Sequence, residues 1–360
     1  RYGHGAPTER IRVVEAGHPV PDVAGESAAH EILQRVSQLQ PGDLLLVLVS
    51  GGGSSLLSLP VPDVSMTALK SVTSMLLASG APIEQMNVVR KHLSRISGGR
   101  LAAAAAARGA QVVALIISDV TGDAPSDIAS GPCAPDPSTY ADAISVLSRW
   151  NVVAPDEVST WLRLGASGEV AETPKPRDPL FARVENRIIA TAHQSLQAAA
   201  EVFRSAGIDA VLLGDTVTGE AREVAKVYAA LVREIRARNH PFKVPIALIS
   251  GGECTVTLPG GMGGRGGRCT EFLLSLAVEL GGMRDVHALA CDTDGIDGSE
   301  MNAGAWLSPE SITAAAARGV DARESMASHD AYGFFQAADQ LIVTGPTLTN
   351  VNDYRVILVR

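Results

Sequence analysis

The stretch that decides how this chain folds runs from Ile249 to Gly298 and reads ISGGECTVTLPGGMGGRGGRCTEFLLSLAVELGGMRDVHALACDTDGIDG. A strand-like start leads into a glycine-rich loop, an apolar helical run over 269–280 and a second strand-like segment over 286–291. Glycine buries no side chain and loses much backbone entropy on folding, so such a loop is useful where N–H groups must approach an anion closely. The order strand, loop, helix, strand predicts an α/β fold with a ligand site at the strand ends.

The charged residues of this stretch favour an anionic guest. Arg265 and Arg268 lie in the glycine loop, and Asp292, Asp294 and Asp297 follow the second strand. An anion cradle at a helix N-terminus beside carboxylates indicates phosphoryl chemistry. The alternative interpretation is a surface turn followed by helix caps, because aspartate favours both positions. The occurrence of both features in succession, each at a strand end, favours a site.

Composition limits the class of protein. The chain has 360 residues, of which 46% are hydrophobic, and this length predicts two domains or one large one. The net charge of −9 argues against nucleic-acid binding, which needs a basic surface. We expect no membrane association, because no apolar run has the length of a spanning helix. Four cysteines without a C-x-x-C pair predict a reduced, cytoplasmic protein.

A second glycine loop stands in the first half of the chain. Residues 43–49 form a continuous apolar run, which predicts a strand buried on both faces. This strand leads into a loop of glycines and hydroxyls that is typical of an oxyanion-binding turn before a helix. A flexible linker is the alternative, although a buried strand leads straight into the loop. The predicted anion-binding residues are Ser50, Gly51, Gly52, Gly53, Ser54 and Ser55.

Two further groups of polar residues are candidates for the site. The predicted helix over 82–96 carries Asn87, Arg90 and Lys91 on one face, which is either a ligand-binding or a solvated face. Asp119 and Asp123 follow the apolar strand over 112–118. We expect these two carboxylates near a metal ion or nucleotide phosphates, because hard cations prefer oxygen ligands. Caps and turns are the alternative explanation of the aspartates.

The alternation of helices and strands predicts two α/β domains with mostly parallel, Rossmann-like or mixed sheets. The proline-containing segment 239–245 is the best candidate for a linker. We therefore expect domains at 1–242 and 243–360, with strand-end loops that face a shared cleft.

An ordered set of motifs resembles a known family. The motifs are Gly-His-Pro-Val-Pro-Asp at 17–22, Ser-Gly-Gly-Gly-Ser-Ser at 50–55, Asn-Val-Val-Arg-Lys-His-Leu-Ser at 87–94, Gly-Gly-Arg-Leu at 98–101, Ser-Asp-Val-Thr-Gly-Asp at 118–123, Ala-Ser-Gly-Pro at 129–132, Ser-Gly-Gly-Glu at 250–253, Gly-Arg-Gly-Gly-Arg at 264–268, Thr-Asp-Gly-Ile-Asp-Gly at 293–298, and Gly-Pro-Thr-Leu-Thr-Asn-Val-Asn-Asp at 345–353. In this order they resemble the glycerate 2-kinase family, whose C-terminal module is called the MOFRL domain. The resemblance covers essentially the whole chain.

The resemblance implies ATP-dependent phosphorylation of glycerate at its 2-hydroxyl in an interdomain cleft, with a divalent cation, Mg²⁺. It further implies that Arg268 stabilises charge on the transferred phosphoryl group and that Asp294 orients or deprotonates the attacking hydroxyl. The implied partners are the small molecules glycerate and ATP, and homo-oligomer formation is left open. Besides the residues named above, contacts with glycerate or ATP are expected at Gly252, Glu253, Gly264, Arg265 and Asn350.

Two departures from the family pattern affect the expected activity. Family members usually have a lysine where Ser97 stands here. The family also has an N-terminal segment with a Gly-Lys motif whose lysine is considered catalytic, and this sequence starts after it. We therefore expect the chain as given to lack a strand of the first domain and to turn over poorly.

Two other functional classes remain open. Residues 261–266 fit the pattern G-x-G-x-x-G, and Asp292 stands where a ribose-binding acid is wanted. These features are compatible with an NAD(P)H-dependent hydroxypyruvate reductase. The two loop arginines and the glycine loop at 50–55 are not explained by that interpretation. A non-catalytic anion-binding module is the third class.

Overall fold

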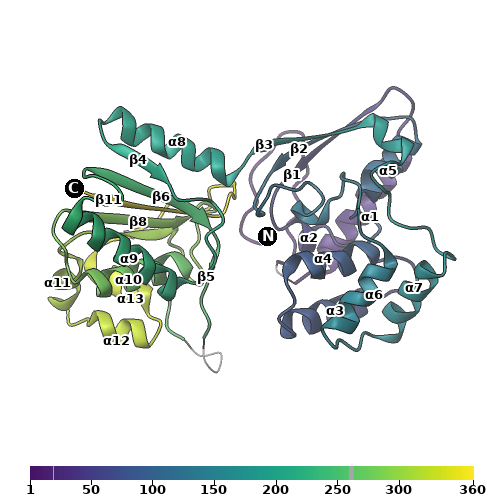
Figure 1. Ribbon diagram of the computed structural model, residues 1–360. Helices are drawn as coiled ribbons and strands as arrows, with labels where there is room; N and C mark the ends of the chain where they lie inside the picture. Colours follow the sequence, from purple (N-terminus) through teal and green to yellow (C-terminus); the bar gives the residue numbers. More distant parts are fainter. Residues whose placement is uncertain (19, 259–262) are drawn as a thin grey trace. The chain divides into compact units, whose positions relative to one another are not determined.

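The computed structural model describes residues 1–18, 20–258 and 263–360 and divides into two compact units (Figure 1). The first unit comprises Arg1–Ile189 and the second comprises Ala190–Arg360. Each unit combines helices with a β-sheet, so the predicted α/β class is confirmed.

The boundary between the units lies well before the predicted position near Lys243. The segment between the two positions contributes β4 (Asp209–Leu212), which pairs in parallel with β6 (Ile246–Gly252) of the second sheet. It also contributes α9 (Ala221–Arg238), which packs along α10 (Arg268–Leu280). The proline-containing segment predicted as a linker therefore connects two elements of one unit, because composition marks a loop but not which sheet its neighbours join.

The first unit contains a three-stranded sheet and two hydrophobic cores. The strand order is β1 (Leu44–Val49), β2 (Gln111–Ile117) and β3 (Val184–Ala190), and β1 and β2 run parallel. One core lies between this sheet and two helices, and the other lies among four helices. The helices of the first core are α1 (Val23–Ser37) and α5 (Arg100–Ala107); those of the second are α3 (Met66–Ala78), α4 (Ile83–His92), α6 (Tyr140–Arg149) and α7 (Asp156–Ala166).

The prediction that β1 is buried on both faces is wrong. Leu44, Leu46 and Leu48 are 58%, 53% and 67% exposed, whereas the alternate residues Leu45, Val47 and Val49 pack into the sheet's core. Successive side chains of a strand point to opposite faces, and the described part of the chain covers only one of them with helices. An apolar run predicts a strand but not a second covering layer.

The second unit contains a six-stranded mixed sheet. Mixed sheets were included in the predicted fold class, but most strand pairs of this sheet are antiparallel. Its order is β10 (Leu341–Ile342), β9 (Gly304–Leu307), β8 (Val286–Asp292), β11 (Asp353–Val359), β6 and β4. Within this six-stranded sheet, as far as the structure describes it, β4–β6 is the only parallel pair. β11 lies antiparallel between β6 and β8, and β9 lies antiparallel to β8 and β10. A central strand is buried on both faces whatever its direction, so an apolar sequence does not reveal the direction.

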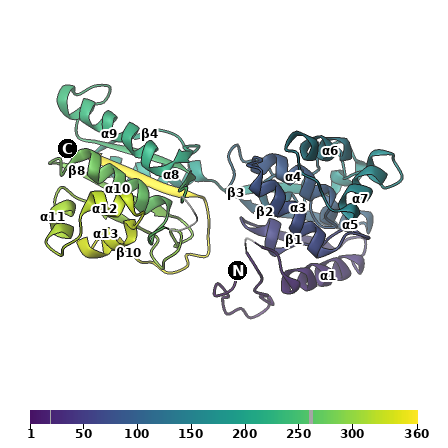
Figure 2. The ribbon, with the colours of Figure 1, turned by 90° about the horizontal axis from the view of Figure 1, so that it is seen from below.

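Helices cover both faces of this sheet (Figures 1 and 2). Alternate residues of β6 point to the two sides: Ile246 and Leu248 join one core, and Ala247 and Ile249 join the other. α8 (Ala192–Ser205) packs on the side of Ala247 and Ile249. The opposite side is covered by α9 and α10, with α11 (Ser311–Ala316), α12 (Ala322–Ala327) and α13 (Ala331–Ala338) beyond them.

Short elements complete the fold. β7 (Cys254–Thr255) pairs in parallel with β5 (Gly219–Glu220), rather than forming a hairpin with β6. α2 (Gly53–Leu56) is a single turn that follows β1, and two 3₁₀ turns span Ile128–Ser130 and Pro179–Arg183.

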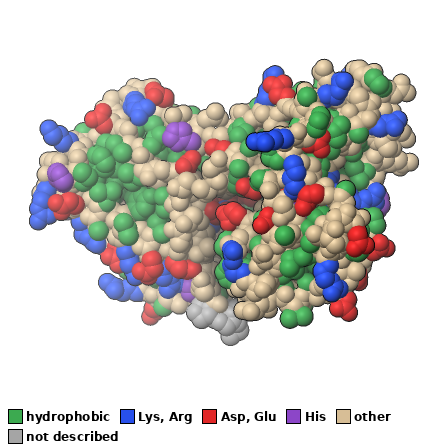
Figure 3. Space-filling model, turned by 45° about the vertical axis from the view of Figure 1, so that its right-hand side comes forward, with side chains coloured by type: hydrophobic (Ala, Val, Ile, Leu, Met, Phe, Trp, Pro, Cys, Tyr) green, Lys and Arg blue, Asp and Glu red, His purple; other side chains and the backbone are tan. Residues whose placement is uncertain are grey.

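Three features of the structure relate to the expectations drawn from composition: the surface charges, the apolar character of the helices and the state of the cysteines. On the face shown in Figure 3, Lys and Arg side chains lie scattered among Asp and Glu side chains, outside the residues drawn in grey. No described helix combines the length and the apolar character needed to cross a bilayer. All four cysteines are free thiols, three of them buried.

Candidate active site

Arg268 is the centre of an ion-pair network in the second unit. It is the first residue of α10, and each nitrogen of its guanidinium group donates to a different carboxylate. Nε donates to Asp353 at 2.8 Å, Nη1 to Glu253 at 2.8 Å and Nη2 to Asp292 at 2.7 Å. Asp353 and Asp292 are buried, whereas the Glu253 side chain is 54% exposed. The network therefore has two internal anchors and one partner in contact with solvent.

The sheet register brings these carboxylates together. Asp292 ends β8 and Asp353 begins β11, and the two residues lie opposite each other in the antiparallel ladder. Arg355, two residues along β11, donates to Asp353 at 2.6 Å and to the carbonyl of Gly251 at 3.0 Å. Asp353 and Arg355 were not predicted as part of the site, although charged residues at alternate positions of an otherwise apolar strand are a signal visible in the sequence.

The network is electrostatically unbalanced, with more carboxylates than arginines. Burial alone would lower the pKa of Arg268, but Asp353, Glu253 and Asp292 together raise it. Burial raises the pKa of Asp292 to about 7, although the Arg268 guanidinium opposes that shift. Asp294 and Asp353 also raise the Asp292 pKa, because they add negative charge nearby. These causes raise the pKa of Asp292 well above that of an ordinary aspartate.

Replacing Asp292 by asparagine is expected to flatten the dependence of stability on pH. The Asp292 pKa is about 7 in the folded state, against a usual value of 3.8, so the folded state binds more protons between those values. The stability contributed by the neutral carboxyl is complete below about pH 4 and is lost as the pH rises through about 7, by up to about 4 kcal/mol. Chemical denaturation of parent and Asp292→Asn between pH 4 and 8 measures the difference.

Glu253→Gln is the matched control for this titration. It removes an exposed carboxylate from the same guanidinium group, so the pH dependence of the parent should persist. An Asp292→Asn protein whose stability falls with rising pH as steeply as that of the parent would contradict the prediction.

The N-terminus of α10 is occupied by a carboxylate of the chain itself. Asp297 accepts hydrogen bonds from the N–H groups of Cys269 at 2.9 Å and Thr270 at 2.8 Å, and from the Thr270 hydroxyl at 2.7 Å. A Cβ at Gly267 would overlap with Asp297, so this glycine permits the close approach. The helix end that we expected to bind a ligand anion is therefore filled by Asp297.

Asp294 lies in the turn that follows β8 and is partly buried. Its Oδ1 accepts the N–H of Ile296 at 2.8 Å, and its own N–H donates to Asp292 Oδ1 at 3.1 Å. The carboxylate therefore shapes the turn and stands two residues from a partner of Arg268. Its role as the base stays a prediction.

A pocket of about 440 Å³ in the second unit adjoins this network. Of the predicted residues, Glu253, Gly264 and Arg268 line it; Gly252 ends the neighbouring strand. A cluster that was not predicted from the sequence adjoins the pocket wall: buried Glu271 accepts through Oε1 from Arg222 at 2.8 Å, and the same oxygen lies 3.0 Å from His329 Nδ1.

Two predicted residues of this unit have other contacts. Arg265 stacks on the Tyr332 ring at 4.9 Å and lies 3.6 Å from Asp330. Asn350 Oδ1 accepts the N–H of Asn352 within its own loop. Neither Arg265 nor Asn350 lines the pocket. Part of the G-x-G-x-x-G pattern, Gly261 and Met262, lies outside the described residues.

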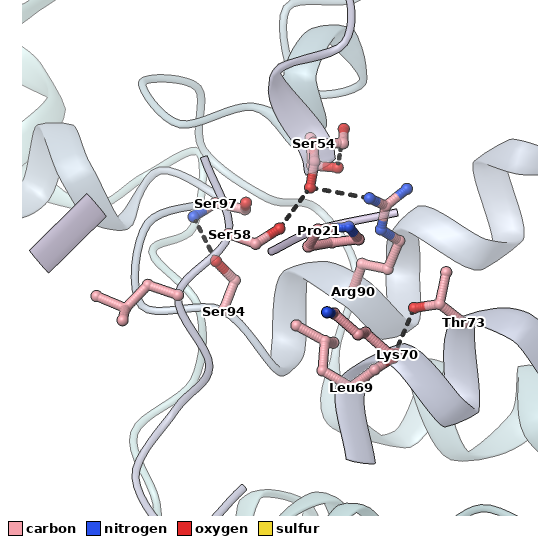
Figure 4. Close-up of a pocket in the computed structure, with 11 residues that line it drawn as sticks. Pro21, Ser54, Ser58, Leu69, Lys70, Thr73, Arg90, Ser94 and Ser97 are labelled. Atoms are coloured by element: carbon pink, nitrogen blue, oxygen red, sulfur yellow. Dashed lines mark hydrogen bonds between the residues drawn. The ribbon is translucent and has the colours of Figure 1, made fainter. Parts of the chain in front are cut away.

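The first unit holds a second, smaller pocket, which includes two predicted residues, Ser54 and Arg90 (Figure 4). Gly52 adopts φ 77°, which turns the chain from β1 into α2 and presents Ser54. The Ser54 hydroxyl lies 2.7 Å from that of Ser130, which donates to Asn87 Oδ1 at 3.2 Å. Asn87 therefore positions the pocket wall, although it does not line the pocket.

The other predicted residues of the first glycine loop lie outside this pocket. Ser50 is exposed, and Gly51 and Gly53 are partly buried. The buried Ser55 donates to the Gly52 carbonyl. Lys91 is 3% exposed and lies 3.1 Å from Asp127 and 3.7 Å from Asp136. Because two carboxylates of the chain neutralise it, Lys91 supplies no free positive charge for an anion.

Asp119 and Asp123 lie in the loop after β2, and both are partly buried. Asp123 adopts φ 53°. In the described ranges, no three His, Cys, Asp or Glu side chains are grouped so that they could hold a metal ion. Mg²⁺ is usually held by one or two carboxylates together with substrate phosphates, so this pair is compatible with such a site without a preformed cage.

These features define a two-unit α/β protein with an arginine–carboxylate network beside one pocket and a hydroxyl-lined pocket in the other unit. Two family models match the chain: "Domain of unknown function (DUF4147)" over residues 1–163 and "MOFRL family" over residues 246–353.

Similar proteins carry two different names. A protein from Agrobacterium vitis named putative hydroxypyruvate reductase is 47% identical over all of this chain and 80% of its own length. The glycerate 2-kinase of Pyrococcus horikoshii is 38% identical over all of this chain and 80% of its own length. The crystal structure of glycerate kinase from Thermotoga maritima superposes with a TM-score of 0.87 and 37% identity, over all of this chain and 84% of that one. The chain belongs to the glycerate kinase family.

Proposed function

We propose that the protein transfers the γ-phosphoryl group of ATP to the 2-hydroxyl of glycerate. The observation that carries this proposal is the Arg268 network beside a large pocket in a chain of the glycerate kinase family. Phosphoryl transfer requires positioning, charge neutralisation and a proton acceptor rather than covalent catalysis by the protein. Arg268 and Asp294 supply the last two of these functions.

Arg268 has two buried carboxylate partners and one exposed carboxylate partner, and this difference explains how it can bind a ligand. Nε and Nη2 are anchored by the buried Asp353 and Asp292, which fix the guanidinium plane. Nη1 is bound by Glu253, whose side chain is exposed. A phosphoryl oxygen replaces Glu253 at Nη1, because a charge-assisted hydrogen bond to an exposed carboxylate is the least costly of the three to exchange.

Asp294 accepts the proton of the attacking hydroxyl in this proposal. Its Oδ1 is held by the Ile296 N–H, which orients the carboxylate. Asp119 and Asp123 provide oxygen ligands for Mg²⁺. When bound, the cation neutralises charge on the phosphates of ATP.

The reductase interpretation has less physical support, although relatives carry that name. In a dinucleotide-binding unit the pyrophosphate sits on the N-terminus of the helix that follows the glycine loop. Here the N–H groups of Cys269 and Thr270 are bonded to Asp297. The candidate ribose-binding acid, Asp292, is bonded to Arg268.

The proposed reaction is tested with the purified chain, ATP, MgCl₂ and D-glycerate. We expect ADP release that requires glycerate and stops when EDTA removes the divalent cation. Phosphorus–proton NMR correlation identifies the phosphorylated oxygen as that on C2. Oxidation of NADH or NADPH with hydroxypyruvate, without formation of ADP in the kinase assay, would replace the proposal by the reductase function.

A further inference from the structure

A small pocket in the first unit contains two cations and no carboxylate. Its volume is about 20 Å³, and it lies between α2, α3, α4 and the segment after α4 (Figure 4). The residues that line it are Pro21, Ser54, Ser58, Leu59, Leu69, Lys70, Thr73, Arg90, Ser94, Ser97 and Ser130. Five serines, a threonine, a lysine and an arginine give the pocket a positive charge and many hydrogen-bond donors.

Arg90 is a largely buried cation without a counter-charge. Its Nη2 donates to the Ser54 carbonyl at 2.9 Å, and it forms no salt bridge with any carboxylate of the described residues. Burial lowers the pKa of the guanidinium, and no neighbouring carboxylate opposes that shift. A buried charge is unfavourable unless it is paired, so the site lacks an anion that would stabilise Arg90.

Two other cations of the chain are, in contrast, paired with carboxylates. Lys91, the next residue of α4, pairs with Asp127 and Asp136. Arg268 of the second unit pairs with three carboxylates. The fold therefore supplies internal carboxylates to Lys91 and Arg268 but not to Arg90.

Lys70 adds a second cation from a different helix. It is the only charged residue of α3, whose other residues are apolar or hydroxylated. Its side chain is partly buried and lines the pocket, and Nζ forms no hydrogen bond or ion pair with another residue of the described ranges. The sequence signal for Lys70 was a lone lysine in an apolar helix.

The hydroxyls of the pocket are arranged around these cations. Ser58 donates to the Ser54 carbonyl, the same oxygen that Arg90 contacts. Ser94 Oγ accepts the N–H groups of Ile96 at 3.1 Å and Ser97 at 3.0 Å. Because its lone pairs are used in this way, the Ser94 hydroxyl is oriented to donate its hydrogen to a ligand.

We propose that this pocket binds the carboxylate of the acceptor substrate, a small hydroxy acid of the glycerate class. Two cations and several hydroxyl donors match a carboxylate that carries a neighbouring hydroxyl. The volume of about 20 Å³ leaves room for about one water-sized group, so the pocket excludes a nucleotide and would take only one end of a small acid at its mouth. The inference rests on the proposed function, in which glycerate is the acceptor.

The test compares Arg90→Gln and Lys70→Gln with Arg95→Gln. Arg95 is exposed, does not line the pocket and belongs to the same segment as Arg90, so it controls for loss of surface charge. Loss of a charge-assisted hydrogen bond should raise KM for D-glycerate roughly 10- to 100-fold in the two pocket variants. KM for ATP should stay within about twofold of the parent, and Arg95→Gln should match the parent.

A binding titration without ATP separates this inference from the proposed reaction. D-glycerate is titrated into parent and variants by calorimetry, with glycerol as the probe that lacks a carboxylate and inorganic phosphate as the competing anion. Binding of D-glycerate that Lys70→Gln weakens, while glycerol binding is unchanged, supports the pocket even if no phosphorylation is found. The partly exposed Lys70 keeps the test informative if Arg90→Gln fails to fold.

Two outcomes would overturn the inference. In the first, both pocket variants bind D-glycerate as the parent does. In the second, they lose affinity for inorganic phosphate and ATP but not for D-glycerate, which would make the pocket a phosphate site. A parent that binds glycerate in this pocket but releases no ADP would instead contradict the proposed function.

Discussion

Arg268→Ala is expected to lower kcat for glycerate phosphorylation by on the order of 10³-fold, the usual effect of removing an arginine that stabilises the transferred phosphoryl group. Nη1, released from the exposed Glu253, is the donor that reaches the phosphoryl oxygens in this mechanism. Alanine removes that donor and the positive charge together. Single-turnover kinetics with saturating ATP and glycerate measure the loss in the chemical step.

The same substitution should also destabilise the protein. Its guanidinium is the shared partner of the buried Asp353 and Asp292. Removing one partner of a buried ion pair costs about 3–5 kcal/mol, because the remaining charge stays buried without compensation. Arg355 still pairs with Asp353 in the variant, so the cost should fall toward the lower value.

Arg268→Lys separates the two effects. A lysine retains the positive charge near Asp292 and Asp353 but cannot donate to three carboxylates in one plane. We expect it to recover most of the stability and little of kcat. A kcat within about threefold of the parent in a well-folded Arg268→Ala protein would remove Arg268 from the mechanism.

Asp294→Asn is expected to lower kcat by about 10²- to 10⁴-fold, as the loss of a general base does. Its stability should stay close to that of the parent, because asparagine keeps the Oδ1 acceptor for the Ile296 N–H. The isosteric amide therefore preserves the turn while removing the proton acceptor. Parallel measurements of kcat and of the melting temperature distinguish these contributions.

Asp294→Ala provides the control for the structural role. It removes the turn hydrogen bond as well as the base, so it should lower the melting temperature where Asp294→Asn does not. If Asp294→Asn keeps a kcat near that of the parent while Asp294→Ala loses stability, the residue only shapes the turn. The proton acceptor would then have to be sought elsewhere, with Asp292 as the first candidate.

Local patterns in the sequence were sufficient to predict the elements and the family. Apolar runs marked β1, β6 and β8, and the helical run predicted over 269–280 corresponds to α10 (Arg268–Leu280). These patterns depend on neighbouring residues, which the sequence shows directly. Strand direction and the unit boundary depend on which distant segments pair, as β4 does with β6, and composition does not record that choice.

Within the site, the sequence by itself determined which residue types are present, and the tertiary structure decided what each of them contacts. The sequence identified Arg268 and Asp294 by their place in the motif, but Asp353 joins Arg268 only because β11 lies against β8. The sequence-based prediction also placed Arg90 and Lys91 together on one face of a helix, without distinguishing their roles. In the fold Lys91 meets two carboxylates and Arg90 meets none, because successive helical residues point in directions about 100° apart. Charge is a property of the residue, whereas its neutralisation depends on packing.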